Sequence, residues 1–411
     1  MNAGSAHLAA SSLGGLVTVN AWRPLRRGAV STLSWASGLV TSELPLQTMA
    51  WQAAATGYFA SRGALRTRRG RAGLALSAAS WAGLVALHRE AQRSQAVLEQ
   101  ALVDELGSDY RRQLAPQWAP PEVPLTRRQL ALPARGSRRR YARDRDLAYG
   151  ELGVRNHLDI WRRPDLPADA PAPVLLQIHG GAWATGSKRG QAYPLLSHLA
   201  ERGWVGVAIN YRLSPRSTWP DHIVDVKTSI AWIKANIARY GGDPNFIAVT
   251  GGSAGGHLTA LTALSAGDPA FQPGFEDADT TVQAAIPMYG LYDFTNRDGT
   301  GRTDTIDFLA DKVLKSRLDD DRERWDQASP MSRVRADAPP MFVVHGTNDS
   351  LLPVEQARTF AELLRKESTR PVVYAELPRA QHAFDAFGSL RTLYTVRAVD
   401  RFLASVLSTP A

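Results

Sequence analysis

The sequence contains no cysteine. Its 411 residues therefore hold no disulfide, no thiolate metal ligand and no cysteine nucleophile. This absence does not select a cellular compartment, but it means that any nucleophile has to come from another residue type. Apolar residues make up 44% of the chain and charged residues 21%, which are proportions typical of a folded protein.

Lysine is scarce as well. Only six of the 48 basic residues are lysines, so the net charge of +9 comes almost entirely from arginine. Five arginines lie within Arg62 to Arg71, and three more are Arg138, Arg139 and Arg140. Such clusters suit nucleic acid or an anionic membrane surface. Since apolar stretches accompany them and no nucleic-acid motif does, we expect a membrane surface as partner, contacted through residues 28–87, and no nucleic acid.

Long stretches of the first 90 residues carry no charge, namely those between Arg27 and Glu43, between Glu43 and Arg62, and from Ala72 to Leu87. The last stretch has 16 residues, and a spanning helix needs roughly 20. Its small residues suit a membrane helix or an interfacial one, and a buried helical hairpin is the alternative. Arginines flank both ends, so the charges select no topology. We expect a membrane-associated protein, otherwise a cytoplasmic one. The first 21 residues lack Lys and Arg, which argues against a cleavable signal peptide.

The composition and residue pattern divide the chain into three parts. Residues 1–115 are predicted to be helical, with a final amphipathic helix over 88–114, and residues 116–145 are rich in Pro and Arg and predict a linker. Residues 146–411 alternate between strand-like and helix-like patterns, which predicts an α/β fold with a mostly parallel sheet covered by helices on both faces. The expected strands are 158–161, 174–179, 204–209, 246–249, 282–288, 341–345 and 372–377, and the expected helices are 223–240, 353–366 and 391–407.

The clearest chemical motif is Gly251-Gly252-Ser253-Ala254-Gly255. An apolar run precedes it and a helix-compatible run follows it, which is the strand, tight turn and helix that a nucleophile elbow needs. Glycines around the serine tolerate unusual backbone angles and leave its oxygen exposed. An ordinary turn with a helix-capping serine is the alternative interpretation.

A serine hydroxyl needs a base, and the base needs an orienting acid. Asp349 follows the strand expected at 341–345, and the carboxyl ends of strands are where such sites collect. His382 follows the strand expected at 372–377 and is the only histidine downstream of Asp349. Because the partners in such folds follow in the order serine, acid, histidine, we predict Ser253, Asp349 and His382 as the catalytic residues.

The oxyanion of a tetrahedral intermediate needs hydrogen-bond donors already in place. The residue after the nucleophile, Ala254, supplies one N–H group. The loop His179-Gly180-Gly181-Ala182-Trp183 follows an upstream strand, so Gly180 and Gly181 are the other expected donors. We expect structural roles for His179, His257 and His345. The candidates for lining a substrate pocket are Trp183, Tyr211, Tyr289 and Phe384, for which core packing is an equal explanation.

Together these motifs resemble the α/β-hydrolase superfamily. The set comprises H-G-G-A-W at 179–183, N-Y-R-L-S-P at 210–215, G-G-D-P at 241–244, G-G-S-A-G-G-H at 251–257, H-G-T-N-D at 345–349 and Q-H-A-F at 381–384. The nearest groups are the hormone-sensitive-lipase-like and carboxylesterase-like bacterial esterases. The resemblance covers roughly residues 146–407 and implies an α/β-hydrolase fold with the triad and oxyanion donors named above. Two positions depart from it, since many members carry Asp where Gly252 stands and Gly where Ala182 stands.

These observations predict a serine carboxylic ester hydrolase that forms an acyl-enzyme on a small-molecule or lipid ester and needs no metal or organic cofactor. An amidase, peptidase or formamidase with the same triad is the nearest alternative, and a catalytically silent, membrane-tethered binding module is another. Residues 293–335 are expected to cap the site together with the helix at 88–114.

Overall fold

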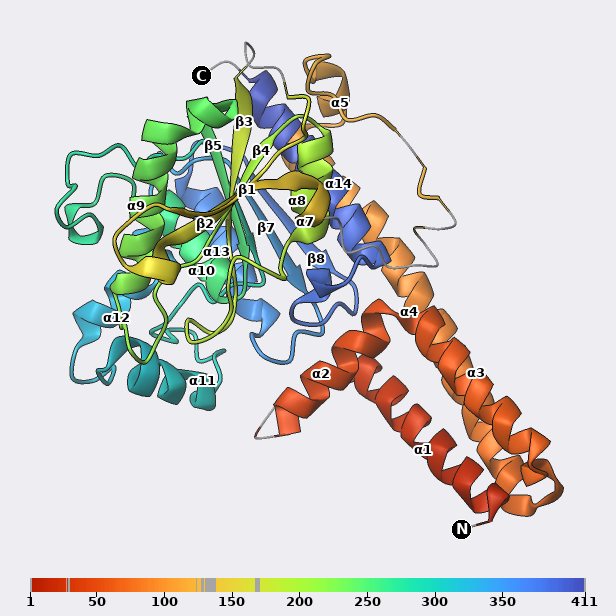
Figure 1. Cartoon of the computed structure of the whole chain (residues 1–411). Helices are drawn as coiled ribbons and strands as arrows, with labels where there is room; N and C mark the ends of the chain where they lie inside the picture. The colour runs from red at the N-terminus through yellow and green to blue at the C-terminus, as the bar shows by residue number, and fades with distance from the viewer. Residues whose placement is uncertain are drawn as a thin grey trace.

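An eight-stranded sheet forms the centre of the C-terminal part of the molecule (Figure 1). A computed structural model describes residues 2–26, 28, 30–122, 124–126, 129, 138–166 and 171–409 of the chain. The strands are β1 (Ala142–Ala148), β2 (His157–Trp161), β3 (Ala172–Ile178), β4 (Val205–Ile209), β5 (Gly242–Gly252), β6 (Ala284–Met288), β7 (Met341–Gly346) and β8 (Val372–Leu377). Their order is β1-β2-β4-β3-β5-β6-β7-β8. Only the β1–β2 and β2–β4 pairs are antiparallel, so the predicted, mostly parallel sheet is confirmed.

Helices cover both faces of the sheet. One face packs against α9 (Asp221–Asn236), α10 (Ala254–Leu264) and α13 (Val354–Glu367), and the other against α8 (Tyr193–Glu201) and α14 (Leu390–Ser408). Successive side chains of a strand point to opposite faces, and each face of this sheet therefore has its own apolar core. Every residue of β3 and β4 is buried, as expected for strands covered on both sides.

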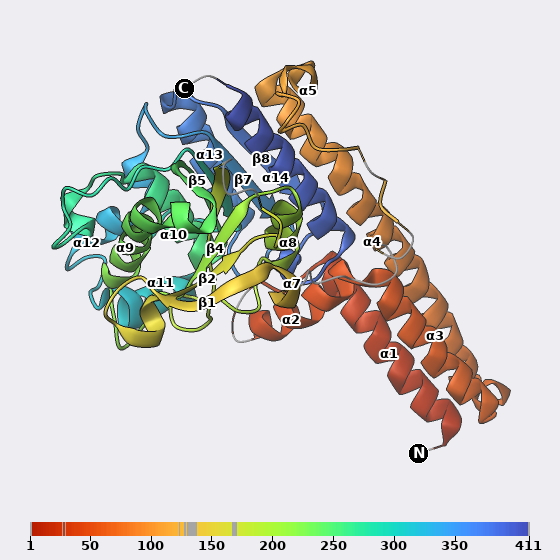
Figure 2. The ribbon, with the colours of Figure 1, turned by 45° about the horizontal axis from the view of Figure 1, so that its top comes forward.

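An elongated helical arm extends from one side of the sheet domain (Figures 1 and 2). It consists of α1 (Ala3–Trp22), α3 (Pro45–Ser61) and the first half of α4 (Arg68–Leu106), which lie side by side, and of α2 (Val30–Glu43), which crosses toward the sheet domain. The Thr67 side chain caps α4 by accepting the N–H of Gly70 at 3.0 Å, and the helix ends at Gly107. Thus α4 is one rod of 39 residues that belongs to both parts of the molecule.

Two features of the predicted organisation are wrong. The interval 116–145 is not all linker, because α7 (Arg138–Tyr141) and β1 belong to the sheet domain. The residues 88–106 do not cap the site. They continue α4 without a break and bury Leu98 and Leu102 against α14, while a short helix α5 (Tyr110–Gln113) follows.

The predicted cap at 293–335 contains four short helical segments. These are α11 (Thr303–Phe308), the π-helical segment η5 (Leu309–Leu314), α12 (Arg322–Ala328) and η6 (Pro330–Arg333). The Arg302 guanidinium donates to the Ser350 carbonyl at 2.6 Å, and Ser350 follows Asp349 directly. The segment therefore lies beside the loop after β7.

Candidate active site

Ser253 lies on the turn between β5 and α10 with a backbone conformation of φ 60° and ψ −123°. Residues other than glycine rarely adopt a positive φ, and such strain persists only where the surroundings fix it. Here the Ser253 N–H donates to the Met288 carbonyl, and the His257 N–H donates to the Ser253 carbonyl, both at 3.0 Å. The turn thus has the strained strand-to-helix geometry of a nucleophile elbow.

The side chains of Ser253, His382 and Asp349 form one hydrogen-bonded chain. His382 Nε2 lies 2.9 Å from Ser253 Oγ, and His382 Nδ1 lies 2.7 Å from Asp349 Oδ2. Since a carboxylate can only accept, Nδ1 carries the proton and Nε2 is left to accept one from the serine hydroxyl. The structure therefore brings together the three residues that the sequence singled out, in the arrangement that general-base activation of a serine requires.

Asp349 is held in place on both carboxylate oxygens. Its Oδ1 accepts the N–H groups of Leu351 at 2.9 Å and Leu352 at 2.8 Å, and its Oδ2 also lies 3.2 Å from His345 Nε2. Burial would raise its pKa, but the charge of His382 and hydrogen bonds from both histidines outweigh burial and hold the pKa of Asp349 well below its usual range. The carboxylate consequently stays ionised and orients His382.

The glycine loop after β3 packs directly against the nucleophile turn. The N–H of Gly180 donates to Gln191 Oε1 at 2.7 Å, so this predicted oxyanion donor is engaged with a side chain. A Cβ atom on Gly180 would lie 3.2 Å from Ser253 Cβ and 2.6 Å from the Gly252 carbonyl oxygen. Within the described residues, the N–H groups of Gly181 and Ala254 have no hydrogen-bond acceptor. The absence of a side chain at Gly180 therefore leaves room for Ser253.

Gly252 is one of the two positions that depart from the pattern described above, and the structure leaves no room for a side chain there. A Cβ atom there would lie 2.1 Å from the Tyr289 hydroxyl. That hydroxyl donates to Asp385, and the Tyr289 ring meets the His382 ring edge-on with centroids 5.0 Å apart. Tyr289 thus occupies the space beside the Ser253 turn and packs against the imidazole of His382.

The four aromatic residues predicted as pocket candidates are all buried, with 0–5% of their surface exposed. Trp183 donates to His257 Nδ1 at 3.1 Å, and Tyr211 donates to the His179 carbonyl at 2.9 Å. Phe384 packs edge-on against Tyr289. Core packing accounts for these contacts.

No pattern in the sequence predicted that helix α2 contacts the loops that carry Asp349 and His382. The Trp35 indole N–H donates to the His382 carbonyl at 2.9 Å. Arg26, just before α2, donates to the Thr347 carbonyl at 2.8 Å, and Asn348 donates to the Ala21 carbonyl at 2.8 Å. The N-terminal arm is therefore fastened to the loops that follow β7 and β8.

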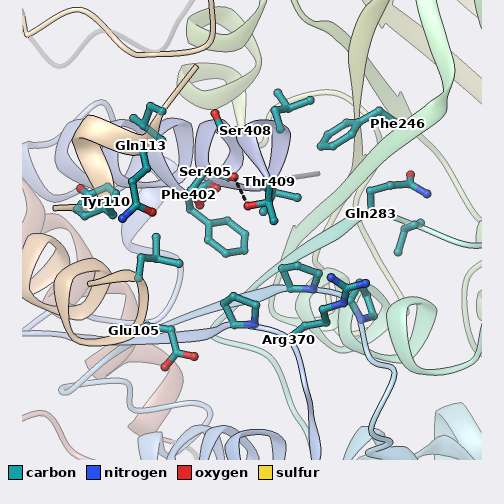
Figure 3. Close-up of a pocket in the computed structure, with 18 of the residues that line it drawn as sticks. Glu105, Tyr110, Gln113, Phe246, Gln283, Arg370, Phe402, Ser405, Ser408 and Thr409 are labelled. Carbon is teal, nitrogen blue, oxygen red and sulfur yellow. Dashed lines mark hydrogen bonds between the residues drawn. The ribbon is translucent and has the colours of Figure 1, made fainter. Parts of the chain in front are cut away.

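A separate groove of about 790 Å³ lies at the amino-terminal ends of the central strands (Figure 3). Its lining includes Phe246 in the first half of β5, Gln283 and Pro340 directly before β6 and β7, and residues from the end of α14. The triad lies at the carboxyl ends of the strands, so this groove is remote from Ser253.

The sheet order, the strained serine turn and the hydrogen-bonded Ser-His-Asp arrangement define an enzyme of the α/β-hydrolase fold. More particularly, the chain belongs to the BD-FAE family, whose model matches residues 158–364. It is a carboxylesterase-type hydrolase.

The sequence is similar to those of curated esterases along nearly its whole length. It is 54% identical over 396 residues to the probable carboxylic ester hydrolase LipM of Mycobacterium tuberculosis, covering 95% of this chain and 91% of LipM. It is 46% identical to esterase LipQ of the same organism, covering 95% of this chain and 88% of LipQ. Among solved structures, esterase 2 of Thermogutta terrifontis phosphonylated by sarin is 27% identical, with a TM-score of 0.56 over 62% of this chain and 92% of that one.

Proposed function

We propose that Ser253 attacks the carbonyl carbon of an acyl ester while His382 Nε2 takes the hydroxyl proton. A bond forms between Ser253 Oγ and the acyl carbon, and the carbonyl electron pair moves onto its oxygen. When the tetrahedral intermediate collapses, the bond to the alcohol oxygen breaks and His382 returns the proton to that oxygen. Asp349 stabilises the imidazolium formed in between. The observation that carries this proposal is the 2.9 Å and 2.7 Å chain from Ser253 through His382 to Asp349.

The acyl-enzyme is then hydrolysed by the same groups. His382 takes a proton from water, the water oxygen attacks the acyl carbon, and the ester bond to Ser253 breaks as the proton returns to Oγ. The products are a carboxylic acid, an alcohol and the free enzyme.

The oxyanion is proposed to accept hydrogen bonds from the N–H groups of Gly181 and Ala254, since these lack acceptors within the described chain. Removing one such donor costs roughly 3 kcal/mol of transition-state stabilisation in related chemistry. The N–H of Gly180 joins them only if Gln191 moves away, because Gln191 Oε1 holds it at 2.7 Å.

Substrate selection is proposed to depend on residues 293–335, which lie beside the loop that carries Asp349. The protein is further proposed to be membrane-associated through its N-terminal arm. By its length and mean hydropathy, α4 taken by itself meets the criteria of a membrane-crossing helix.

The test is hydrolysis of a chain-length series of nitrophenyl esters beside the matching anilides, by the wild-type protein and by Ser253→Ala. We expect the wild type to cleave esters in preference to anilides and the variant to cleave neither. Cleavage of anilides at rates equal to those of esters would favour an amidase instead, and equal activity of the two proteins would refute the role of Ser253.

A further inference from the structure

The arm has its large apolar side chains on the outside. Among the described residues, thirteen large hydrophobic side chains are exposed, and eleven of these lie between residues 13 and 85. The eleven are Leu13, Leu16, Val19, Leu25, Val30, Leu33, Val40, Trp51, Tyr58, Leu76 and Val85. Exposed fractions reach 67% at Leu16 and 78% at Trp51. Because α1, α3 and α4 each contribute, the apolar surface surrounds the arm instead of forming one patch.

Apart from an apolar cluster of Ala21, Leu84 and Leu87 near the sheet domain, the side chains inside the arm are small and polar. Ser11 on α1 and Ser77 on α4 are hydrogen-bonded at 2.9 Å, and Thr18 and Ser80 at 2.8 Å. Ser80 also donates to Gln52 of α3 at 2.8 Å. A helical bundle stable in water has the opposite arrangement, with apolar side chains inside and polar ones outside. Hydroxyl pairs between closely packed helices are typical of bundles in lipid.

Glycines let the helix axes approach closely, as they do in membrane bundles. A Cβ atom on Gly73 of α4 would lie 3.2 Å from the Leu8 Cα of α1, and one on Gly14 of α1 would lie 3.1 Å from the Gln52 side chain of α3. The three helices of the arm are thus joined by backbone proximity and hydroxyl hydrogen bonds.

The length and charge of the arm match a bilayer. α1 has 20 residues, which span about 30 Å, the thickness of a hydrocarbon core. Neither α1 nor α3 contains Asp, Glu, Lys or Arg, and α4 has none from Ala72 to Leu87. Arginines stand at both ends of this uncharged zone, with Arg62, Arg66, Arg68, Arg69 and Arg71 at the tip and Arg23, Arg26, Arg89 and Arg93 near the sheet domain. Long basic side chains at such boundaries reach the head groups.

We propose that α1, α3 and the first half of α4 form a three-helix bundle that spans a lipid bilayer, with α2 lying at the membrane surface. The outer face of α2 carries Val30, Leu33 and Val40, and its inner side binds the His382 loop through Trp35. The bundle therefore holds the active site at the lipid surface. Resting on the proposed function, this makes esters dissolved in the membrane the expected natural substrate class, while short water-soluble esters can still reach the site.

The experiment uses the absence of cysteine. Single-cysteine variants Leu16→Cys, Trp51→Cys and Leu76→Cys are labelled with an environment-sensitive fluorophore in the full-length protein. The matched controls are Leu152→Cys and Val154→Cys, which are exposed apolar positions of the sheet domain, at 50% and 62%. The proteins are placed in vesicles of phosphatidylcholine and phosphatidylglycerol. Quenching is measured with iodide in the water and with lipids that carry a nitroxide on the acyl chain.

We expect the three arm labels to lose fluorescence to the acyl-chain nitroxide and not to iodide, and the two control labels to do the reverse. Iodide quenching of the arm labels equal to that of the controls would overturn the proposal. Shielding from iodide without any lipid, in a protein of doubled mass, would overturn it in favour of a second copy of the chain.

Hydrolysis of a short, water-soluble nitrophenyl ester by each labelled protein reports the active site separately. A variant that loses this activity is replaced by Leu13→Cys or Tyr58→Cys, which lie on α1 and α3. Bilayer insertion with no esterase activity in any protein would refute the proposed chemistry, while activity without insertion would refute only the membrane bundle.

Discussion

The indole of Trp35 donates a hydrogen bond of 2.9 Å to the backbone carbonyl of His382, which lies 347 residues further along the chain. The loop that carries the His382 imidazole is therefore hydrogen-bonded to helix α2 of the N-terminal arm. Because this bond goes to the His382 backbone, we expect Trp35 to act as a positioning residue for His382.

Trp35→Phe removes this hydrogen bond and keeps an aromatic ring. A typical hydrogen bond contributes about 0.5–1.5 kcal/mol, so we expect kcat to fall about two- to tenfold with KM nearly unchanged. Steady-state kinetics on a short nitrophenyl ester provide the measurement. Trp51→Phe, an exposed tryptophan of the arm, is the control. A rise in KM with unchanged kcat would show that Trp35 acts on substrate binding instead.

Gly252→Ala tests the contact between the nucleophile turn and Tyr289. The added Cβ would lie 2.1 Å from the Tyr289 hydroxyl, so the ring has to move away from Asp385 and His382. Overpacking of this kind costs roughly 1–3 kcal/mol, and we expect lower thermal stability together with lower kcat. Gly57→Ala is the matched control, because nothing lies within 4 Å of a Cβ there. Equal behaviour of the two variants would contradict the interpretation.

Glu43→Ala tests the attachment of the arm. Glu43 at the end of α2 and Arg391 of α14 form a fully buried ion pair at 3.0 Å, and Ser389 donates to the second carboxylate oxygen at 2.8 Å. Burial raises the pKa of Glu43 against the opposing effects of Arg391 and Ser389. Removing one partner of a buried pair costs roughly 3–5 kcal/mol. We expect a large loss of thermal stability in detergent, and little loss for Glu90→Ala, whose arginine partner is exposed.

The buried imidazole of His257 should make the free energy of unfolding depend on pH. Its Nδ1 accepts from Trp183, so Nε2 carries the proton and donates to the Ala328 carbonyl at 2.8 Å. Burial lowers the pKa of His257 to about 4. The unfolded chain binds this proton near pH 6.5 and the folded protein does not, so stability falls as pH drops from about 6.5 to about 4.

The full effect at His257 is on the order of 3 kcal/mol. Buried His179 and His222 have pKa values lowered in the same direction by burial, so the contribution of His257 is isolated by comparison with His257→Gln. Denaturant unfolding at several pH values between 4 and 7 should give a shallower pH slope for the variant. Identical slopes would show that His257 binds its proton over the same pH range in the folded and the unfolded chain, against the lowered pKa.

The sequence predicted the triad because each member lies next to a local pattern that chain order can connect. Ser253 has its glycine turn, and Asp349 and His382 each follow a recognisable buried strand. It missed β1 because A-R-D-R-D-L-A lacks the apolar alternation of a covered strand, and an edge strand needs less of it.

Features that arise from contacts between segments far apart in the sequence could not be predicted from it. The uncharged run ends at His88 and Arg89, which suggested a boundary between two helices, although α4 continues through them to Leu106. The hydrogen bonds of Trp35 and Gln191, and the space that Tyr289 takes beside Gly252, arise from packing in three dimensions and leave no local pattern in the sequence.

The most direct test of the proposed Ser253, His382 and Asp349 mechanism is labelling by a fluorophosphonate, combined with ester hydrolysis, of the wild type, Ser253→Ala and His382→Ala. We expect the wild type to be labelled at Ser253 and to hydrolyse the ester. Both variants should lose labelling, and their kcat should fall by at least on the order of a thousandfold. Labelling of the wild type at another residue, or undiminished hydrolysis by Ser253→Ala, would contradict this mechanism.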